Sequence, residues 1–211
     1  MQMYYRLLSL IVLATLIAGC PEPAEPLRPV EGTHLIMPLK VGNRWIGTWT
    51  LHNDDGSIIL AIPDTLTIIA EEKVGDETGF QGSDGAFYLN RADGLWVRSG
   101  ETGDSLVLQA KYPAAVGETF SAEQVTTLLP EGPAGPTDVT IAMAVLDTAR
   151  RVSTEAGIYR CYLYQPRILD HPDISLAGRL RRKYYAPDVG PVRIDWPDGS
   201  QRWELVSATI R

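Results

Sequence analysis

The sequence is poor in the residues that most often build disulfide frameworks and metal sites. Its 211 residues include two cysteines, Cys20 and Cys161, and three histidines. Two cysteines exclude a disulfide framework, because a single Cys20–Cys161 bridge is all that they can form. No pair of histidines or cysteines has the spacing of a metal site, and HExxH and CxxC motifs are missing. We therefore predict no metal and no cofactor.

Motifs of catalysis are missing as well. The sequence has no GxSxG elbow and no GxxxxGK phosphate loop. Its histidines are scattered: His34 lies in a proline-rich segment, His52 ends an apolar run, and His171 precedes a proline. We predict that the protein is not an enzyme and assign no catalytic residue. A hydrolase with a dispersed site is the alternative, which would show His52 or His171 facing a cavity beside an aspartate or serine.

The charge of the chain excludes a further class of partner. The formal net charge is -7 at pH 7, and an acidic protein of this kind is not expected to bind nucleic acid through its phosphates. Acidic residues cluster at Asp54-Asp55 and Asp76-Glu77, but not with the spacing of a calcium loop. We interpret these clusters as β-turns.

An apolar segment near the N-terminus is the first feature that is present. Residues 7–18 form an almost unbroken apolar run of about a dozen residues, short of the roughly 20 that span a bilayer. The run ends in LIAGC at residues 16–20. This segment resembles the lipobox of bacterial lipoproteins, in which a peptidase cuts before the cysteine and that cysteine is acylated. A membrane-spanning anchor is the alternative, and the length of the run argues against it.

The lipobox resemblance implies where the mature protein lies. Residues 1–19 would be a cleaved signal peptide, and Cys20 would carry two or three acyl chains, palmitate among them. Two or more chains hold a protein on a membrane stably. The expected location is the cell envelope, and the outer membrane is favoured because Pro21 follows Cys20 where aspartate marks inner-membrane retention in some bacteria. Acylation would leave Cys161 unpaired, as a small core residue.

The mature chain divides into a linker and one domain. Five prolines fall between residues 21 and 38, and such a segment favours extended polyproline II structure. We predict a lipidated linker over residues 20–38 and a single domain over residues 39–211. About 170 residues suffice for one hydrophobic core.

The domain shows no long helical periodicity. Short runs rich in Val, Ile, Thr, Tyr and Trp alternate with clusters of turn residues, which is typical of an all-β domain. We expect a strand over residues 44–52, a tight turn at 53–56 and a returning strand at 57–62 that Pro63 ends. Further strands are expected near residues 65–70, 78–81, 86–90, 95–98, 105–110, 139–145, 157–167, 174–186, 192–196 and 201–210.

These strands have local, hairpin-like connections. About ten such strands predict a mainly β domain built on a strongly curved antiparallel sheet, a half-barrel or open barrel. Residues 112–120 repeat the pattern of residues 37–45, with a proline, a Val-Gly pair and an aromatic residue at matching positions. We interpret the two segments as equivalent turns, each placing its aromatic residue in the core.

Three motifs together resemble a group of uncharacterised bacterial lipoproteins: PLKVGNRW at residues 38–45, STEAGIYRC at 153–161 and KYYAPDVGPVR at 183–193. The group is similar to LolA/LolB-type half-barrels, in which a curved sheet cups an apolar space. The resemblance implies no catalytic residue. It implies that the motif residues are fold markers: turns at Gly42, Gly157 and Gly190, and core positions at Trp45 and Tyr185.

Two groups of residues are candidates for contact with a ligand or lipid surface. Trp45 and Trp49 belong to a set of five tryptophans that either line an apolar cavity or fill the core. Arg179, Arg181 and Lys183 alternate onto one strand face, where they either meet anionic headgroups or form a solvated, charge-protected edge. The expected function is a membrane-anchored lipoprotein that binds an apolar ligand or acylated client. The alternative is a structural or assembly component of the envelope that acts through protein–protein contacts.

Overall fold

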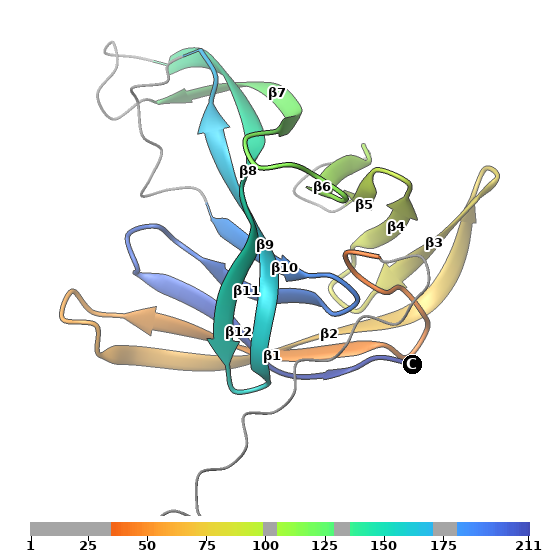
Figure 1. Cartoon of the computed structure of the whole chain (residues 1–211), viewed down its shortest axis with the longest axis horizontal. Helices are drawn as coiled ribbons and strands as arrows, with labels where there is room; N and C mark the ends of the chain where they lie inside the picture. The colour runs from red at the N-terminus through yellow and green to blue at the C-terminus, as the bar shows by residue number, and fades with distance from the viewer. Residues whose placement is uncertain (1–34, 99–104, 129–135, 171–180) are drawn as a thin grey trace, which may run out of the picture.

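The computed structural model describes residues 35–98, 105–128, 136–170 and 181–211, and side chains between 122 and 138 are not described (Figure 1). Several predictions lie outside the described residues: the signal peptide, Cys20, most of the linker, His171 and Arg179.

The described residues form twelve strands joined as antiparallel neighbours. They are β1 (Arg44–His52), β2 (Ile58–Val74), β3 (Glu77–Gly82), β4 (Phe87–Arg91), β5 (Gly94–Arg98), β6 (Val107–Lys111), β7 (Thr119–Leu128), β8 (Pro136–Thr154), β9 (Gly157–Ile168), β10 (Arg182–Ala186), β11 (Gly190–Asp195) and β12 (Gln201–Thr209). Their order in the single sheet is β6-β5-β4-β3-β2-β1-β12-β11-β10-β9-β8-β7. The first and last strands therefore pair, and β6 and β7 form the two edges.

The sheet curls until its two edges nearly meet. The Ser121 hydroxyl of β7 donates a 2.7 Å hydrogen bond to the Leu108 carbonyl of β6. The Tyr164 hydroxyl of β9 donates another, also 2.7 Å, to the Lys111 carbonyl. Figure 1 shows β8 and β9 running from the lower part of the molecule to the top, where β7 lies above β6. The predicted curved antiparallel sheet is confirmed, with twelve strands rather than about ten.

The concave face of the sheet carries the core. Because side chains alternate along a strand, Trp45, Ile68 and Tyr185 point inward together with Tyr164, and all four are buried. Phe120 packs edge-on against Tyr164 at 5.7 Å between ring centroids. The middle of the concave face is thus filled by the protein's own side chains rather than left open.

One predicted break in the sheet is wrong. We expect Pro63 to end a strand, yet β2 continues through it, with Pro63 opposite Thr48 of β1. The Ile68 N–H bonds to the Asn43 carbonyl of the β1 side, and hydrogen-bonding positions alternate along an antiparallel pair. The nitrogen of Pro63 therefore faces away from β1, where no hydrogen bond to that strand is lost.

The boundary predicted for the linker is also corrected. Ile36 and Met37 are buried in the core, although the sequence places them in the proline-rich segment. Leu35 makes two hydrogen bonds with Asp188: its carbonyl accepts from the Asp188 backbone N–H at 2.7 Å, and its N–H donates to the side-chain Oδ1 at 3.2 Å. The last residues of the expected linker therefore belong to the domain.

The predicted equivalence of residues 37–45 and 112–120 is confirmed. Gly42 and Gly117 have φ angles of 89° and 90°, which glycine adopts without strain. The N–H of each donates a 2.8 Å hydrogen bond to the next long strand, to Ile68 and Val145 respectively. Each turn is followed by a buried aromatic residue, Trp45 or Phe120.

Candidate functional site

Partly exposed apolar residues on the concave face gather at one end of the sheet. Leu51 and Trp49 follow Trp45 on the inward side of β1, and they lie opposite Leu60 and Ile62 of β2. Leu60 is 49% exposed and Ile62 is 51% exposed. We call Leu51, Leu60 and Ile62 the apolar strip. It continues the core outward, beyond the part that the protein's own side chains cover.

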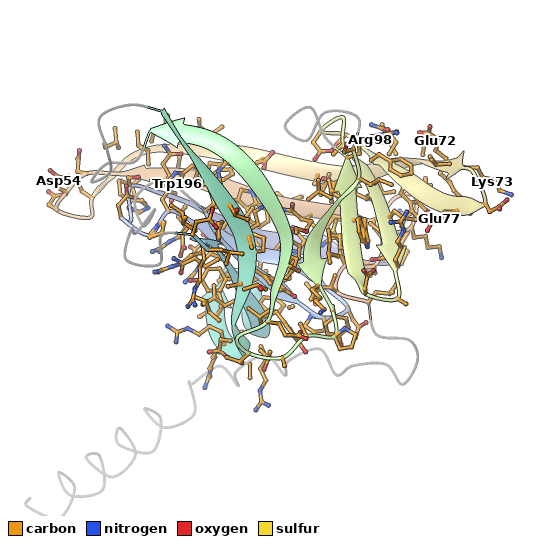
Figure 2. All side chains as sticks on the ribbon, turned by 90° about the horizontal axis from the view of Figure 1, so that it is seen from above. Asp54, Glu72, Lys73, Glu77, Arg98 and Trp196 are labelled. Carbon is orange, nitrogen blue, oxygen red and sulfur yellow. The ribbon has the colours of Figure 1, made fainter. Side chains whose placement is uncertain are left out.

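A cationic and aromatic cluster borders this strip. The rings of Trp49 and Trp196 pack edge to face, with centroids 5.8 Å apart and planes at 65°. The guanidinium carbon of Arg181 lies 4.5 Å from the Trp196 centroid and 5.8 Å from that of Trp49. We call these three residues the Trp49 cluster. Figure 2 places Trp196 at the end of the molecule that carries Asp54, opposite the end with Glu72 and Lys73.

Three distant parts of the chain supply the cluster. Trp49 sits in β1 opposite Trp203 of β12. Trp196 follows β11 in a tight turn, in which its carbonyl accepts from the Gly199 N–H at 2.9 Å. Arg181 directly precedes β10. The hairpin turn between β11 and β12 is what brings Trp196 beside Trp49.

Trp203 separates the cluster from the core. Its indole lies over Gly47, where a side chain would have no room, and it is nearly fully buried. Its Nε1 is buried and has no hydrogen-bond partner within the described residues. Trp203 therefore lies at the boundary between the buried core and the exposed region. Trp49, on the exposed side of this boundary, is only partly buried.

The structure describes two of the three residues of the predicted basic face. Arg181 and Lys183 share one side of the chain, and Lys183 lies opposite Ile194 of β11. Arg182 points to the other side, where its Nε donates to the Gln165 side chain at 3.1 Å. Arg179 lies outside the described residues, so its predicted place on this face stays a prediction.

Trp45 does not belong to the site. Its side chain is completely buried, and its Nε1 donates a 2.6 Å hydrogen bond to the Val189 carbonyl. It offers no surface to a ligand, and we correct its assignment from candidate contact to core residue. Trp196, Leu60 and Ile62 were missed by the sequence reasoning. The only signal for Trp196 was its membership of the set of five tryptophans.

A second polar cluster lies on the convex side of β10–β12. Arg193 pairs with Glu204 across the strands at 2.5 Å. Asp195 lies on the same side, and burial raises the pKa of its carboxyl, against the lowering effect of Arg202, Arg182 and Arg193. Arg193 Nε, Arg202 Nε and Asp195 Oδ1 are buried and have no hydrogen-bond partner within the described residues. Arg193 and Glu204 oppose each other across the strands.

The described residues offer little for catalysis or metal binding. His52 uses both ring nitrogens near the β1–β2 turn, toward the Thr50 hydroxyl at 2.9 Å and the Gly56 carbonyl at 3.2 Å. No group of three histidine, cysteine or acidic side chains able to hold a metal ion occurs in the described part of the chain. The same part contains no apolar helix of membrane-spanning length.

Cys161 is the core residue that the sequence predicts. It is fully buried and unpaired. Burial raises the pKa of its thiol to about 12, slightly opposed by the charge of Arg193. A thiol in such surroundings stays protonated and unreactive at neutral pH.

Comparisons with known proteins find distant likenesses. No protein-family model and no curated protein matches the chain. One similar solved structure, described as an exported protein with a YmcC-like fold from Bacteroides fragilis, has 12% identity and a TM-score of 0.46, covering 84% of this chain and 100% of that one. A second, described as a lipoprotein from Parabacteroides distasonis, has 13% identity and a TM-score of 0.43, covering 85% and 100%.

Proposed function

We propose that the protein is an envelope lipoprotein, anchored through acylated Cys20, that binds the apolar chain of a ligand on the apolar strip beside Trp49. One observation carries the proposal: the concave face is filled from Trp45 to Tyr164, yet Leu60 and Ile62 stay about half exposed where it opens. An apolar sheet face that continues the core and is not covered by the described residues is a candidate binding surface.

The free energy gained by burying the apolar strip suits a flexible alkyl chain as the ligand. Full burial of one leucine or isoleucine side chain stabilises by about 1.5–3 kcal/mol, and half of each of these surfaces is already buried. Covering Leu60 and Ile62 would thus contribute about 1 kcal/mol apiece. The indole of Trp49 adds a flat apolar surface next to them. An alkyl chain laid across these side chains gains affinity from each.

A neutral apolar probe tests the proposal directly. The full chain carrying Cys20→Ser, which cannot be acylated, is purified without detergent and titrated with N-phenyl-1-naphthylamine, whose emission rises in apolar surroundings. We expect a rise that dodecylglycerol displaces. Ile62→Gln weakens both effects about fivefold or more, because it places an amide in the strip.

Ile69→Gln is the matched control. Ile69 lies in the same strand with a nearly equal exposure, 54% against 51%, but on the other side of the sheet. It should leave probe binding unchanged. Absence of probe binding, or equal losses in the two variants, contradicts a ligand site on the strip.

Anchoring is tested separately from binding. A Cys20→Ala variant should leave the membrane fraction when membranes are washed with high salt, because its acyl chains are lost. Retention after that wash overturns the lipid anchor and leaves the ligand site to be judged by the probe alone.

An unpaired strand edge favours a second function, as a structural or assembly component of the envelope. β2 pairs with β3 only from Ile68 onward, so the edge of its first half has no neighbouring strand within the described residues. Ile58 and Ile59 on this edge are 60% and 55% exposed. An exposed apolar edge is a template for a strand of another protein.

Photo-crosslinking in cells separates the two functions. A crosslinker placed at Ile59 should capture one defined envelope protein if the edge has a partner, and the same crosslinker at Ile69 should not. Capture of lipid alone at Ile59 contradicts the assembly function. It leaves the binding function in place.

A further inference from the structure

We propose that the Trp49 cluster selects the head group of the ligand: Arg181 binds the anionic head of a single-chain amphiphile whose alkyl chain lies along the apolar strip. This inference rests on the function proposed above and adds to it the chemical class of the ligand. It depends on the geometry of Arg181, on its charge environment and on the curvature of the sheet.

The guanidinium of Arg181 lies against two aromatic rings and has no hydrogen-bond partner within the described residues. Its guanidinium carbon lies 4.5 Å from the Trp196 ring and 5.8 Å from that of Trp49. Stacking engages the faces of a guanidinium, whereas its five N–H donors point outward in its plane, in a fork that matches a carboxylate or phosphate. The two indoles lie beside the group and carry no hydrogen-bond acceptor atom for its donors.

Arg181 has no carboxylate partner among the residues that the structure describes. Within the described residues, Arg91, Arg193 and Arg202 each lie in an ion pair with a glutamate, and Arg181 lies in none. One exposed carboxylate, Asp64, lies on the same side of β2 as Ile62, opposite Gly47 rather than beside Trp49. Arg181 therefore supplies the positive charge at the Trp49 end of the strip.

The arrangement gives the ligand a direction. Trp49 touches Arg181 on one side and lies opposite Ile62 on the other. A head group bound at Arg181 would place the first carbons of its chain over the Trp49 indole. The following carbons would lie over Ile62 and Leu60, which are the half-exposed side chains of the strip.

The curvature of the sheet favours a single amphiphile molecule over a membrane surface. Trp49 lies on the same side of β1 as buried Trp45, which is the concave side. Tyr164 of β9 points to that side and donates to the Lys111 carbonyl of β6, so the sheet curls toward it. A flat bilayer meets the outside of such a shape, whereas one extended molecule fits within it. We therefore commit to a monomeric ligand.

Paired probes with the same chain and different heads test the inference. Dodecanoate and neutral dodecylglycerol are titrated below their critical micelle concentrations into the full chain with Cys20→Ser, by isothermal calorimetry. We expect dodecanoate to bind about tenfold more tightly, the usual effect of one charge-assisted, bidentate hydrogen bond. Arg181→Gln should remove that tenfold preference and leave dodecylglycerol binding unchanged.

Two further variants and a salt titration sharpen the result. Arg181→Lys should keep part of the preference, since it keeps the charge but loses the planar fork. Arg44→Gln, an exposed arginine in the same strand as Trp49 on the opposite side, should have no effect. The preference of the unmutated site for dodecanoate should shrink as salt rises, a readout that needs no substitution.

The outcomes separate this inference from the function on which it rests. Binding of neither probe overturns both. Equal binding of the two probes, or equal weakening of both by Arg181→Gln, overturns the anionic head group and leaves the apolar-chain function standing. A dodecanoate preference that Arg44→Gln also removes would show general electrostatic attraction and would overturn the assignment to Arg181.

Discussion

The indole Nε1 of Trp45 donates a 2.6 Å hydrogen bond to the carbonyl oxygen of Val189, 144 residues further along the chain. The bond joins the first strand to the turn between β10 and β11. Trp45 belongs to the first of the three sequence motifs and Val189 to the third, so the two motifs meet in the core. Trp45 and Val189 therefore help to build the fold.

Loss of this bond should destabilise the protein strongly. Trp45→Phe leaves the buried Val189 carbonyl without its donor and creates a small cavity, so we expect the free energy of unfolding to fall by about 2–3 kcal/mol. Urea denaturation measures the loss. Trp96→Phe is the control, because the Trp96 indole donates to Asp93 at an exposed site. Equal losses in the two variants would show that the Trp45 bond has no special role.

Two glycines with positive φ should respond differently to alanine. Gly190 has φ 104° and Gly199 has φ 78°, so alanine strains the backbone at both, by about 1–2 kcal/mol. At Gly190 the new Cβ would also lie 3.0 Å from Trp45 Nε1 and 3.1 Å from Met37 Cγ, whereas at Gly199 it meets nothing within 4 Å. Thermal unfolding should therefore show a larger drop in Tm for Gly190→Ala. A larger drop for Gly199→Ala would contradict the packing around Trp45.

Neutralising Asp195 and neutralising Glu204, both on the convex side, should have opposite effects on the stability of the fold at neutral pH. Burial raises the pKa of Asp195, so its contribution to stability is present in acid and is lost as the pH rises through that raised pKa. Asp195→Asn should match or exceed the unmutated protein in stability at neutral pH, and the difference should vanish in acid.

Glu204→Gln should instead lower the free energy of unfolding at neutral pH by about 1–2 kcal/mol, because Arg193 loses its charged partner. Urea midpoints across a pH series measure both effects. A destabilised Asp195→Asn at neutral pH would show that its ionised carboxylate is favourable in the fold.

Cys161 should be inert in the folded protein. Its pKa is raised to about 12 from the model-peptide value of 9.0, so its contribution to stability is present below the lower value and is lost as the pH rises toward the higher one. At about pH 8, a disulfide reagent should label the folded chain at least about 100-fold more slowly than the urea-unfolded chain. Similar rates in the two states would place Cys161 at an accessible site.

Pro63 should protect the unpaired edge of β2 against self-association. Its nitrogen faces away from β1, so Pro63→Val adds an N–H donor to the exposed edge without disturbing the pairing with Thr48. We expect an unchanged urea midpoint and increased self-association in light scattering. Thr65→Val is the control, since it changes a side chain of the same edge and adds no donor. A lowered midpoint with no association would indicate that Pro63 serves the folding of β2 instead.

Local patterns in the sequence predicted much of the sheet. Residues 44–52 form the expected first strand, and Gly42 and Gly117 occupy equivalent turns. These features depend on alternation and on backbone angles, which neighbouring residues determine. The prediction failed at Pro63 because a proline breaks a strand only where its missing N–H faces a neighbour, and only strand pairing shows which way the nitrogen faces.

The candidate site was less predictable. The basic run and the tryptophans were visible, but Trp45 and Trp49 look alike in sequence: both lie on the inward side of one strand. Only the packing of Met37 and the β10–β11 turn around Trp45 covers it completely, and nothing described covers the region beyond Trp49. Trp196 joins the cluster through a turn that no short-range pattern places beside β1.

By itself the sequence determined the β class and the positions of the tight turns, since each follows from residues close together in the chain. The envelope location expected from LIAGC at residues 16–20 stays a prediction. The tertiary structure alone decided that the concave face is filled as far as Trp203 and left half exposed at Leu60 and Ile62. It also decided that Arg181 stacks on Trp49 and Trp196. The burial of the concave face and the contacts of Arg181 depend on how far the sheet curls and on which distant strands meet. No short segment of the sequence determines such long-range packing.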